Sequence, residues 1–282
     1  MSNQLSPLGR FEKILVATDT SEFSAGALRV AMALVKKCGG MLTVMTMVKT
    51  NPEYESIAPE LHRQAEVSAR EHVDKVREDA RAQGLEIDTL VRRGDTPDAE
   101  IVDAAEEIKA DLIVMGRRGR RGIARFMVGD AVVKVIGHAH CSVLVVPKAA
   151  EMWHSRILMA TDGSRYSDAA ATSAAKVAKV CGLPVTVVSA TAPSHSDARI
   201  REAHDAVARL AKFFADDGVS TDTRVPQGRP DEAVVLTARE VGADLIVTGT
   251  HGRTGLQKFL MGSVVERIIG QADTPILVVK AS

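Results

Sequence analysis

Short apolar runs alternate along this chain with longer amphipathic stretches. The first run, at 13–18, is almost wholly apolar and predicts a buried strand. Turn residues with helix-capping side chains follow at 19–24, and a stretch rich in Ala, Leu and Val predicts a helix over 25–37 that Gly39 and Gly40 end. Strands that alternate with helices at this spacing favour parallel βαβ units, and therefore a doubly wound α/β fold.

The rest of the first half continues this alternation. A loop is expected at 49–59, because that segment carries an Asn-Pro pair and charged residues. The expected strands are 41–48, 85–91, 111–115 and 142–146, and the expected helices are 60–83, 98–110 and one that starts near 129.

The second half of the chain repeats the first. The segment 157–164 matches 14–21 at an offset of 143, whereas 244–247 matches 111–114 at an offset of 133. The first copy therefore holds ten extra residues between these landmarks, which we place in the loop at 49–59 because surface connections tolerate insertions. We expect two domains, 1–150 and 151–282, with the linker near 148–155.

Composition agrees with two ordinary globular domains. A length of 282 residues suits two α/β cores better than one, and 45% apolar residues are enough to fill them. Aromatic residues make up only 3% of the chain, which disfavours a base-stacking surface, and the formal net charge is zero. Neither a nucleic acid nor a membrane is therefore expected as a partner.

The three cysteines are far apart in the sequence, which argues against a disulfide framework and favours a reducing compartment. Cys38 and Cys181 occupy corresponding positions in the two copies, so we interpret them as small core residues at a helix end rather than as a redox pair. The N-terminal segment lacks the pattern of a signal peptide, and no apolar run approaches the length of a membrane span. The expected location is the cytoplasm.

A glycine-rich loop follows the apolar strand at 244–248. It reads Gly249-Thr250-His251-Gly252, then nine residues, then Gly262-Ser263 at the start of a helix. Strand, glycine loop and helix in this order suit phosphate, because glycine lets the backbone approach and the helix start offers N–H groups and a favourable dipole. Glycines also serve ordinary tight turns, so the motif alone leaves both interpretations open.

Several motifs in a fixed order make the chain resemble the universal stress protein family in its tandem two-domain form. One is a first strand ending in Ala-Thr-Asp with serines two and five residues later. Others are Gly-x2-Gly-x9-Gly followed by Ser or Thr, and a closing apolar strand at 275–279. The resemblance covers essentially the whole chain, twice. The first motif consists of Asp19, Ser21 and Ser24 in one copy and of Asp162, Ser164 and Ser167 in the other.

The resemblance implies an α/β fold of two tandem doubly wound domains, each an adenine nucleotide alpha hydrolase-like unit whose five-stranded parallel sheet is flanked by helices. It also implies ATP, with Mg, at the carboxyl ends of the strands where the strand order switches. In the second copy the triphosphate would be held largely by backbone N–H groups, with Asp162 beside the ribose or metal and two alanines lining the adenine pocket. These residues are Ala160, Asp162, Ala190, Gly249, Gly252, Gly262, Ser263 and Val264.

The first copy departs from this pattern at one position. It keeps Asp19, Gly116, Gly119 and Gly129, but Asp130 stands where the second copy has Ser263. Two unit charges about 4 Å apart at an effective dielectric near 20 repel by roughly 4 kcal/mol before screening. We therefore expect the first copy to bind ATP poorly or not at all.

The glycine loop of the first copy is also dense in arginine. It could be an exposed charged loop, or it could hold a different anion or a partner. The arginines are Arg117, Arg118, Arg120, Arg121 and Arg125.

Other chemistries find less support. The chain has no Gly-x4-Gly-Lys-Ser/Thr sequence, so the loop is not a Walker A motif. His138, His140 and Cys141 are close in sequence, but two histidines one residue apart diverge on a helix and nothing completes a tetrahedral metal set. His251 lies within the glycine motif without an evident orienting carboxylate, so we expect it to serve in binding rather than as a general base.

Two functions of different classes remain open. The chain is either a nucleotide-dependent stress-response regulator, in which ATP orders a surface for a protein partner, or a slow ATPase or nucleotide-modifying enzyme; a ligand-free scaffold would follow if ATP does not bind. By resemblance, the fifth strands of the two domains are expected to meet in an intramolecular pseudo-dimer. A homodimer of two chains, the partner and the stress signal are left open by the sequence.

Overall fold

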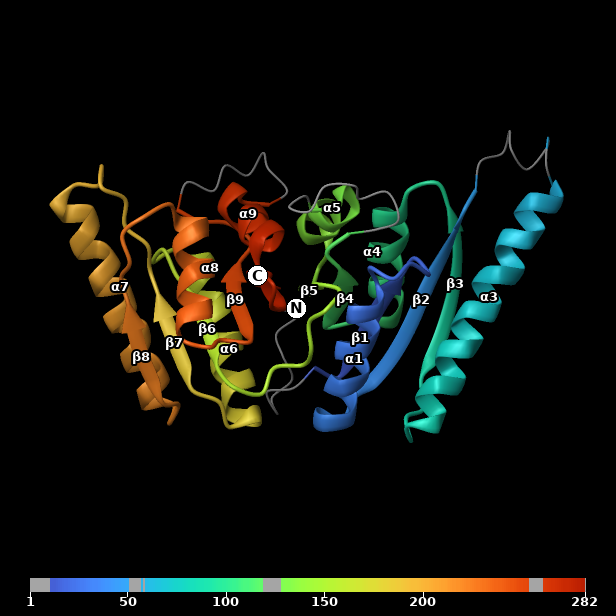
Figure 1. Ribbon diagram of the computed structural model, residues 1–282, viewed down its shortest axis with the longest axis horizontal. Coiled ribbons are helices and arrows are strands. Elements are labelled where there is room, and N and C mark those ends of the chain that lie inside the picture. Colours follow the sequence, from blue (N-terminus) through green and yellow to red (C-terminus); the bar gives the residue numbers. More distant parts are fainter. Residues whose placement is uncertain (1–10, 51–56, 58, 119–127, 254–260, 282) are drawn as a thin grey trace.

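The computed structural model describes residues 11–50, 57, 59–118, 128–253 and 261–281. In the first half of the chain, strands and helices alternate as the hydrophobic pattern predicts (Figure 1). These elements are β1 (Lys13–Thr18), α1 (Ala25–Cys38), β2 (Met41–Lys49), α3 (Pro59–Ala82), β3 (Asp88–Gly94), α4 (Pro97–Ile108), β4 (Leu112–Gly116), α5 (Asp130–His138) and β5 (Ser142–Val146).

The second half repeats the same order of elements. They are β6 (Ile157–Ala160), α6 (Arg165–Cys181), β7 (Val185–Val188), α7 (Asp197–Asp216), β8 (Thr221–Arg224), α8 (Pro230–Glu240), β9 (Leu245–Gly249), α9 (Ser263–Gln271) and β10 (Ile276–Val279).

The extra residues of the first copy do not all lie in the loop that the sequence suggested. Part of the surplus lengthens a helix, since α3 has 24 residues whereas its counterpart α7 has 20. Four residues are about one helical turn, and α3 lies beside β2 and β3, the outermost strands of its half (Figure 1). Residues 51–56 and 58 of the expected loop lie outside the described residues.

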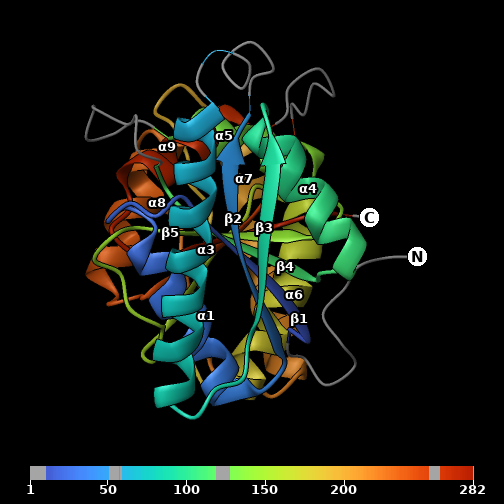
Figure 2. The ribbon, with the colours of Figure 1, turned by 90° about the vertical axis from the view of Figure 1, so that its right-hand side faces the viewer.

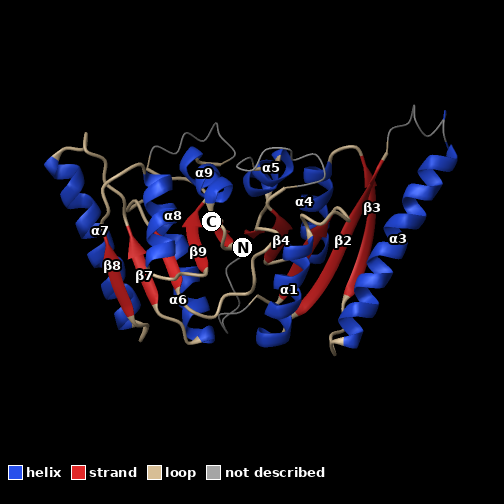
Figure 3. Ribbon diagram, in the orientation of Figure 1, coloured by secondary structure: helices blue, strands red, loops and turns tan. Residues whose placement is uncertain are grey.

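In the part of the chain that the structure describes, ten strands form one sheet (Figure 3), and their order is β3-β2-β1-β4-β5-β10-β9-β6-β7-β8. Within each half the five strands are parallel, as expected. The chain runs outward from β1 to β3 and then returns to the other side of β1 with β4, and β6 to β9 do the same. Each half therefore has a switch point between its first and fourth strands.

The two halves join through their fifth strands, which pair antiparallel. Val145 lies opposite Ile276 and Leu144 opposite Leu277, and all residues of both strands are buried. The expected contact between the fifth strands is thus an internal sheet junction. It covers two edges that would otherwise offer unpaired backbone groups to other chains.

Two long cations tie helix ends across the junction. The Arg117 guanidinium donates to the carbonyl oxygens of Gly270 (3.1 Å) and Ala272 (2.8 Å) at the end of α9. The Lys280 ammonium donates to the carbonyl oxygen of Gly137 near the end of α5 (2.8 Å). A cation at a helix C-terminus satisfies carbonyl groups that lack intrahelical partners and interacts favourably with the helix dipole. Burial lowers the pKa of both side chains, and these carbonyl contacts offset that loss of solvation.

Helices cover both faces of the sheet, and Figure 2 shows α1 and α3 on one side of β2 and β3 with α4 on the other. The buried side chains form one cluster on each face. One cluster includes residues of α1, α3, α6 and α7, and the other includes residues of α4, α5, α8 and α9. Because each cluster draws residues from both halves, each apolar core continues across the junction.

Candidate functional site

The candidate site of the second copy lies at the carboxyl ends of β6 and β9, which are neighbours in the sheet. Ala160 is the last residue of β6, and Gly249 is the last residue of β9. The strand order switches between these two strands, and open α/β sheets bind their ligands at such positions. The structure therefore brings together the two segments that the sequence assigned to one site.

Asp162 connects the turn after β6 to the glycine loop after β9. Its Oδ1 accepts the backbone N–H of Ser164 (3.0 Å), and its Oδ2 accepts the backbone N–H of Arg253 (2.7 Å). Asp162 does not cap the next helix, because the N-cap of α6 is Ser164, whose side chain accepts from Ser167 N–H. The carboxylate instead holds two loops in register at the edge of the sheet.

Two of the motif glycines are required by packing. A Cβ on Gly249 would lie 2.7 Å from the backbone of Tyr166 in α6, and a Cβ on Gly252 would lie 2.6 Å from Oδ2 of Asp162. Gly262 differs, since its nearest neighbour would be the Thr250 oxygen at 3.4 Å, an ordinary contact. Gly249 and Gly252 thus shape the loop, whereas Gly262 is not explained by packing.

Gly262 is the N-cap of α9, and no side chain caps that helix. The backbone N–H of Gly262 itself donates to the carbonyl oxygen of Thr250 (2.9 Å), which fixes the helix start against the loop. By contrast, serine side chains cap α6 and α7. Ser263 is exposed and Val264 half-buried in the first turn of α9. The first N–H groups of α9 are therefore suited to receive an anionic group.

A charged network that the sequence pattern does not predict borders this site. The guanidinium of Arg253 contacts the Glu202 carboxylate of α7, which also accepts from Arg199 (3.1 Å). The hydrogen bond from Arg253 contributes most to lowering the pKa of Glu202, and the hydrogen bond from Arg199 contributes next. The sequence does single out the position of Arg253, because an arginine follows the second motif glycine in both copies. In the first copy this arginine is Arg120.

Aromatic residues lie on another side of the loop. The His251 ring is 5.5 Å from the Tyr166 ring, and its Nδ1 lies 3.2 Å from the Thr250 hydroxyl. The Arg165 guanidinium lies 4.9 Å from the centre of the Tyr166 ring. His251 thus contacts an aromatic ring and a hydroxyl, which fits a position in the binding loop.

The two alanines expected at the adenine pocket lie at the carboxyl ends of adjacent strands. Ala160 is nearly buried at the end of β6, and Ala190 is half-buried just after β7, the strand beside β6. The backbone around Ala190 is held by Ser189 N–H to Arg224 (3.1 Å) and by Thr191 N–H to Pro226 (2.9 Å). Both alanines therefore lie at the same sheet edge as Asp162.

The first copy reproduces the turn after the first strand down to its hydrogen bonds. Thr18 and Ser24 hydroxyls lie 2.9 Å apart, as Thr161 and Ser167 do in the second copy. Asp19 accepts the backbone N–H of Ser21 (3.1 Å), as Asp162 does from Ser164. A repeat visible in the sequence is thus a repeat of polar contacts as well.

The glycine loop of the first copy is described only at its two ends. A Cβ on Gly116 would lie 2.6 Å from the Phe23 carbonyl oxygen, so this glycine too is required by packing. Gly129 is the N-cap of α5, again with no side chain cap. The Asp130 carboxylate is 81% exposed and pairs with Lys134 (2.8 Å), which neutralises part of the charge that we expected to repel phosphate.

Only two arginines of the first loop can be placed. Arg117 donates to carbonyl oxygens at the end of α9, and it also lines a small pocket with Arg118, Phe23 and Lys148. Gly119, Arg120, Arg121 and Arg125 lie outside the described residues.

The sequence-adjacent His138, His140 and Cys141 do not converge. His138 is exposed at the end of α5, the His140 ring contacts the Ala110 carbonyl oxygen (3.1 Å), and Cys141 is buried. Across the described ranges, no group of three or more His, Cys, Asp or Glu side chains is placed to hold a metal ion. Within the same ranges, no helix has both the length and the apolar character of a membrane span.

Comparison with known proteins identifies relatives of both halves. The sequence model of the universal stress protein family matches residues 10–147 and again 154–280. A universal stress protein of Methanocaldococcus jannaschii is 34% identical over 146 residues, 49% of this chain and 83% of the relative. One of Mycolicibacterium smegmatis is 28% identical and spans 95% of this chain and 96% of its own length.

A solved structure extends the similarity to the whole fold. The crystal structure of a universal stress protein from Archaeoglobus fulgidus superposes with a TM-score of 0.76 at 21% identity, and covers 96% of this chain and 98% of that one. At this identity the likeness concerns the fold.

Proposed function

Because the chain belongs to the universal stress protein family and carries its domain twice, we propose that its second copy binds ATP and that the protein acts as a nucleotide-dependent regulator. The observation that carries this proposal is the start of α9. A helix that begins on Gly262 with no side-chain cap, beside the switch point of the sheet, leaves N–H groups directed toward a ligand.

Different residues at this edge would contact different parts of the nucleotide. Backbone N–H groups of the loop and of the first turn of α9 would hold the triphosphate, and Ala160 and Ala190 would contact the adenine. Asp162 would accept from a ribose hydroxyl with its remaining lone pairs or approach a metal ion. Because magnesium usually binds through one or two carboxylates together with phosphate oxygens, it would arrive with the nucleotide. The triphosphate set is Gly249, Gly252, Gly262, Ser263 and Val264.

The proposal includes an asymmetry between the copies. Asp130 replaces Ser263 at the first turn, Thr20 replaces Gly163 in the turn after the first strand, and Arg117 replaces Thr250 in the loop. The ion pair with Lys134 reduces the repulsion from Asp130 but does not turn it into attraction, since a carboxylate offers no donor to phosphate. We therefore propose one ATP per chain, held in the second copy.

Calorimetric titration of ATP into wild type and three single variants tests this proposal. Ser263→Asp should weaken binding at least about tenfold, because a carboxylate at the first turn of α9 repels the triphosphate. Ser263→Ala, the matched control, should change affinity by less than about threefold, because backbone N–H groups dominate. Asp130→Ser should leave the affinity of the second copy unchanged.

The stoichiometry and the nucleotide released from denatured protein complete the test. Intact ATP at one per chain supports the proposal. Two ATP per chain would refute the asymmetry, and no binding would refute the site. ADP or AMP in place of ATP would instead indicate turnover, which the regulator role does not require.

A further inference from the structure

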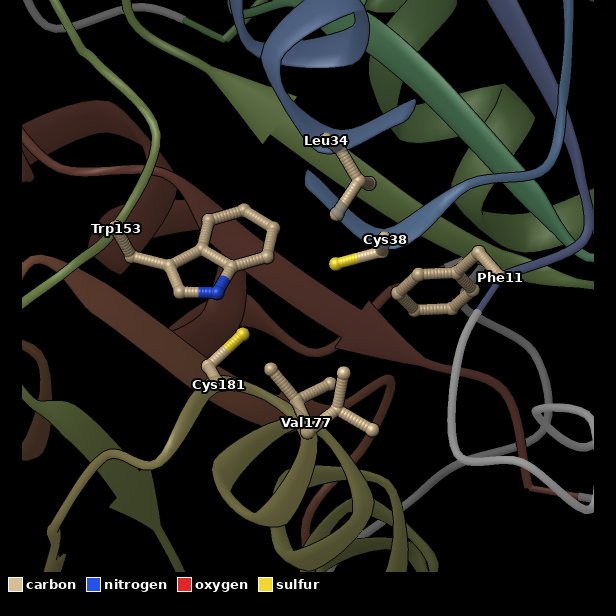
Figure 4. A pocket seen from close by; sticks show the side chains of 7 residues that line it. Phe11, Leu34, Cys38, Trp153, Val177 and Cys181 are labelled. Carbon is tan, nitrogen blue, oxygen red and sulfur yellow. The ribbon is translucent and has the colours of Figure 1, made fainter. Parts of the chain in front are cut away.

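Cys38 and Cys181 meet at the junction of the two halves, although 142 residues separate them in the chain. Cys38 is the last residue of α1 and Cys181 the last residue of α6, so both lie at the amino ends of the strands, opposite the candidate nucleotide site. Figure 4 shows their sulfur atoms directed into the same space beside Trp153. The lining of this pocket is Phe11, Leu34, Cys38, Trp153, Val177, Val180 and Cys181.

The two cysteines differ from the small core residues that the sequence suggested. They pack against one apolar cluster, but both are only half-buried, whereas Cys141 is buried. All three are thiols in this structure. Reagents in solution can therefore reach Cys38 and Cys181 while the fold is intact.

Trp153 gives the pair a polar neighbour. Its side chain is 2% exposed, and within the described ranges its indole N–H has no hydrogen-bond partner. In Figure 4 the indole nitrogen faces the Cys181 sulfur. A buried donor without a partner is costly, and a thiolate beside it would accept from it far better than a thiol does.

The surroundings of the thiols favour ionisation of one of them. The interaction with the Cys38 thiol lowers the pKa of Cys181 to about 6, against the effect of burial, and Trp153 and Lys37 lower it further while Asp244 raises it. Burial raises the pKa of Cys141 to about 12. Thiolates are the nucleophilic form of cysteine, so reactivity at neutral pH is concentrated at Cys181.

We propose that Cys38 and Cys181 form a redox-sensitive thiol pair, which a hydroperoxide oxidises to a disulfide that joins α1 of the first copy to α6 of the second. The Cys181 thiolate attacks the terminal peroxide oxygen, the O–O bond breaks, and the alcohol or water leaves with a proton. The resulting sulfenic acid is attacked by the Cys38 sulfur, the S–S bond forms, and water leaves. Two thiols lose two electrons and two protons, and one peroxide is reduced.

The helix ends can accommodate this bond. Cys38 and Cys181 are each followed by glycine at positive φ, Gly39 at 76° and Gly182 at 66°. Nothing lies within 4 Å of a Cβ built on Gly182, so the end of α6 borders open space. The proposed disulfide requires that small rotations at these glycines bring the sulfur atoms to bonding distance, and glycine permits such rotations more readily than other residues.

Peptide mapping of the full chain after hydrogen peroxide treatment at pH 7 tests the proposal. In wild type we expect the intact mass to fall by two hydrogens and a linked peptide to contain Cys38 and Cys181. Trp153 is the single tryptophan of the chain, so a fluorescence change that a thiol reductant reverses should accompany the bond. Cys141→Ser is the matched control and should form the same link.

Cys38→Ser separates the two steps of the reaction. This variant should accumulate a sulfenic acid at Cys181 that a dimedone-type reagent traps, with no internal link. Three results in wild type would overturn the proposal: a disulfide between two chains, oxygen added at Cys181 with Cys38 unchanged, or no oxidation at either thiol. These three results are measured on the wild-type protein, so a folding defect in a variant cannot affect their interpretation.

Discussion

Thr20 and Gly163 occupy the same place in the two copies, and both have positive φ, 64° and 76°. In each copy the backbone N–H donates to the preceding threonine hydroxyl, at 3.2 Å in the first and 3.0 Å in the second. A β-branched residue in the left-handed region is strained by about 1–2 kcal/mol, whereas glycine is not. The first copy therefore holds strain at the turn that follows β1, which corresponds to the turn beside the candidate site of the second copy.

Replacing Thr20 with glycine should relieve this strain. After allowance for the greater freedom of glycine in the unfolded chain, we expect Thr20→Gly to raise the free energy of unfolding by roughly 0.5–1 kcal/mol. Denaturant titration measures the change. The reverse substitution, Gly163→Thr, should destabilise, because a Cβ at that position would also lie 2.8 Å from the Arg253 guanidinium. A destabilised Thr20→Gly protein would show that this turn is not strained.

At the residue scale, the sequence predicted which positions gather at the site but not what holds them there. The family resemblance assigned Asp162 and the glycine loop to one site, and in the structure Asp162 accepts from the backbone N–H of Arg253 in that loop. Periodicity cannot reveal that the backbone of Tyr166 leaves no room for a side chain at Gly249, or that Asp162 accepts from Arg253. Both contacts join segments more than 80 residues apart. Such contacts depend on the relative placement of strands, which no local pattern contains.

Between elements, Asp231 links α8 to α9. Its side chain is 1% exposed and pairs with Arg267 of α9 (3.1 Å), while Gln271 donates to its other oxygen (2.8 Å). Burial acts to raise the pKa of Asp231, but the hydrogen bonds from Gln271 and Arg267 outweigh it, so the pKa is lowered. The helix that begins at the candidate phosphate site is thus anchored by one carboxylate.

Asp231→Asn should lower the free energy of unfolding by about 2 kcal/mol near neutral pH, because it removes a buried charge from two arginines that can still reach solvent. A carboxyl group whose pKa is lower in the folded state stabilises the fold at pH values above its pKa in the unfolded chain, which is near 4. This stabilisation is lost as the pH falls through the folded-state pKa. The variant should therefore lose less stability than wild type between about pH 4 and pH 2. Thermal melts over this range measure the difference.

The corresponding pair in the first copy is the control. Asp98 lies 3.9 Å from Lys134, which already pairs more closely with Asp130. Asp98→Asn should therefore cost clearly less than Asp231→Asn. Equal losses would show that the two helix pairs are anchored in the same way.

At the element scale, buried strands were easier to predict than edge strands. In the expected strand at 111–115, residues 112–115 form a continuous apolar run, and β4 spans Leu112–Gly116. The expected strand at 85–91 is shifted, since β3 spans Asp88–Gly94. This edge strand is only partly buried and carries Arg92 and Arg93, so its hydrophobic pattern does not mark where pairing begins.

Over the whole molecule, the sheet and both cores are continuous across the junction of β5 and β10. The two halves should therefore unfold together in one transition. Leu144→Asp would place a charge opposite Leu277 within this junction, and we expect it to cost more than about 4 kcal/mol and to raise amide exchange in β10 as well as β5. Hydrogen exchange with mass spectrometry measures both strands.

Leu144→Met provides the comparison for that experiment, because it keeps volume and apolar character and should preserve a single transition. If Leu144→Asp raised exchange in the first half alone, the halves would be independent units that only touch. The linker between the halves would then be the sole coupling.

The junction also removes a constraint that identical subunits cannot escape. In a twofold-symmetric dimer each substitution appears in both subunits at once, so the same residue must serve both sides of the interface. Here Arg117, which follows β4, donates to a carbonyl oxygen at the end of α9. The corresponding end of α5 accepts from Lys280, which follows β10. Because the two halves here belong to one chain, each residue occurs only once and can be substituted without changing its counterpart in the other half. The matching edges of the two halves can thus differ independently, and Asp130 in the place that Ser263 has in the second copy is a difference that a symmetric pair could not carry.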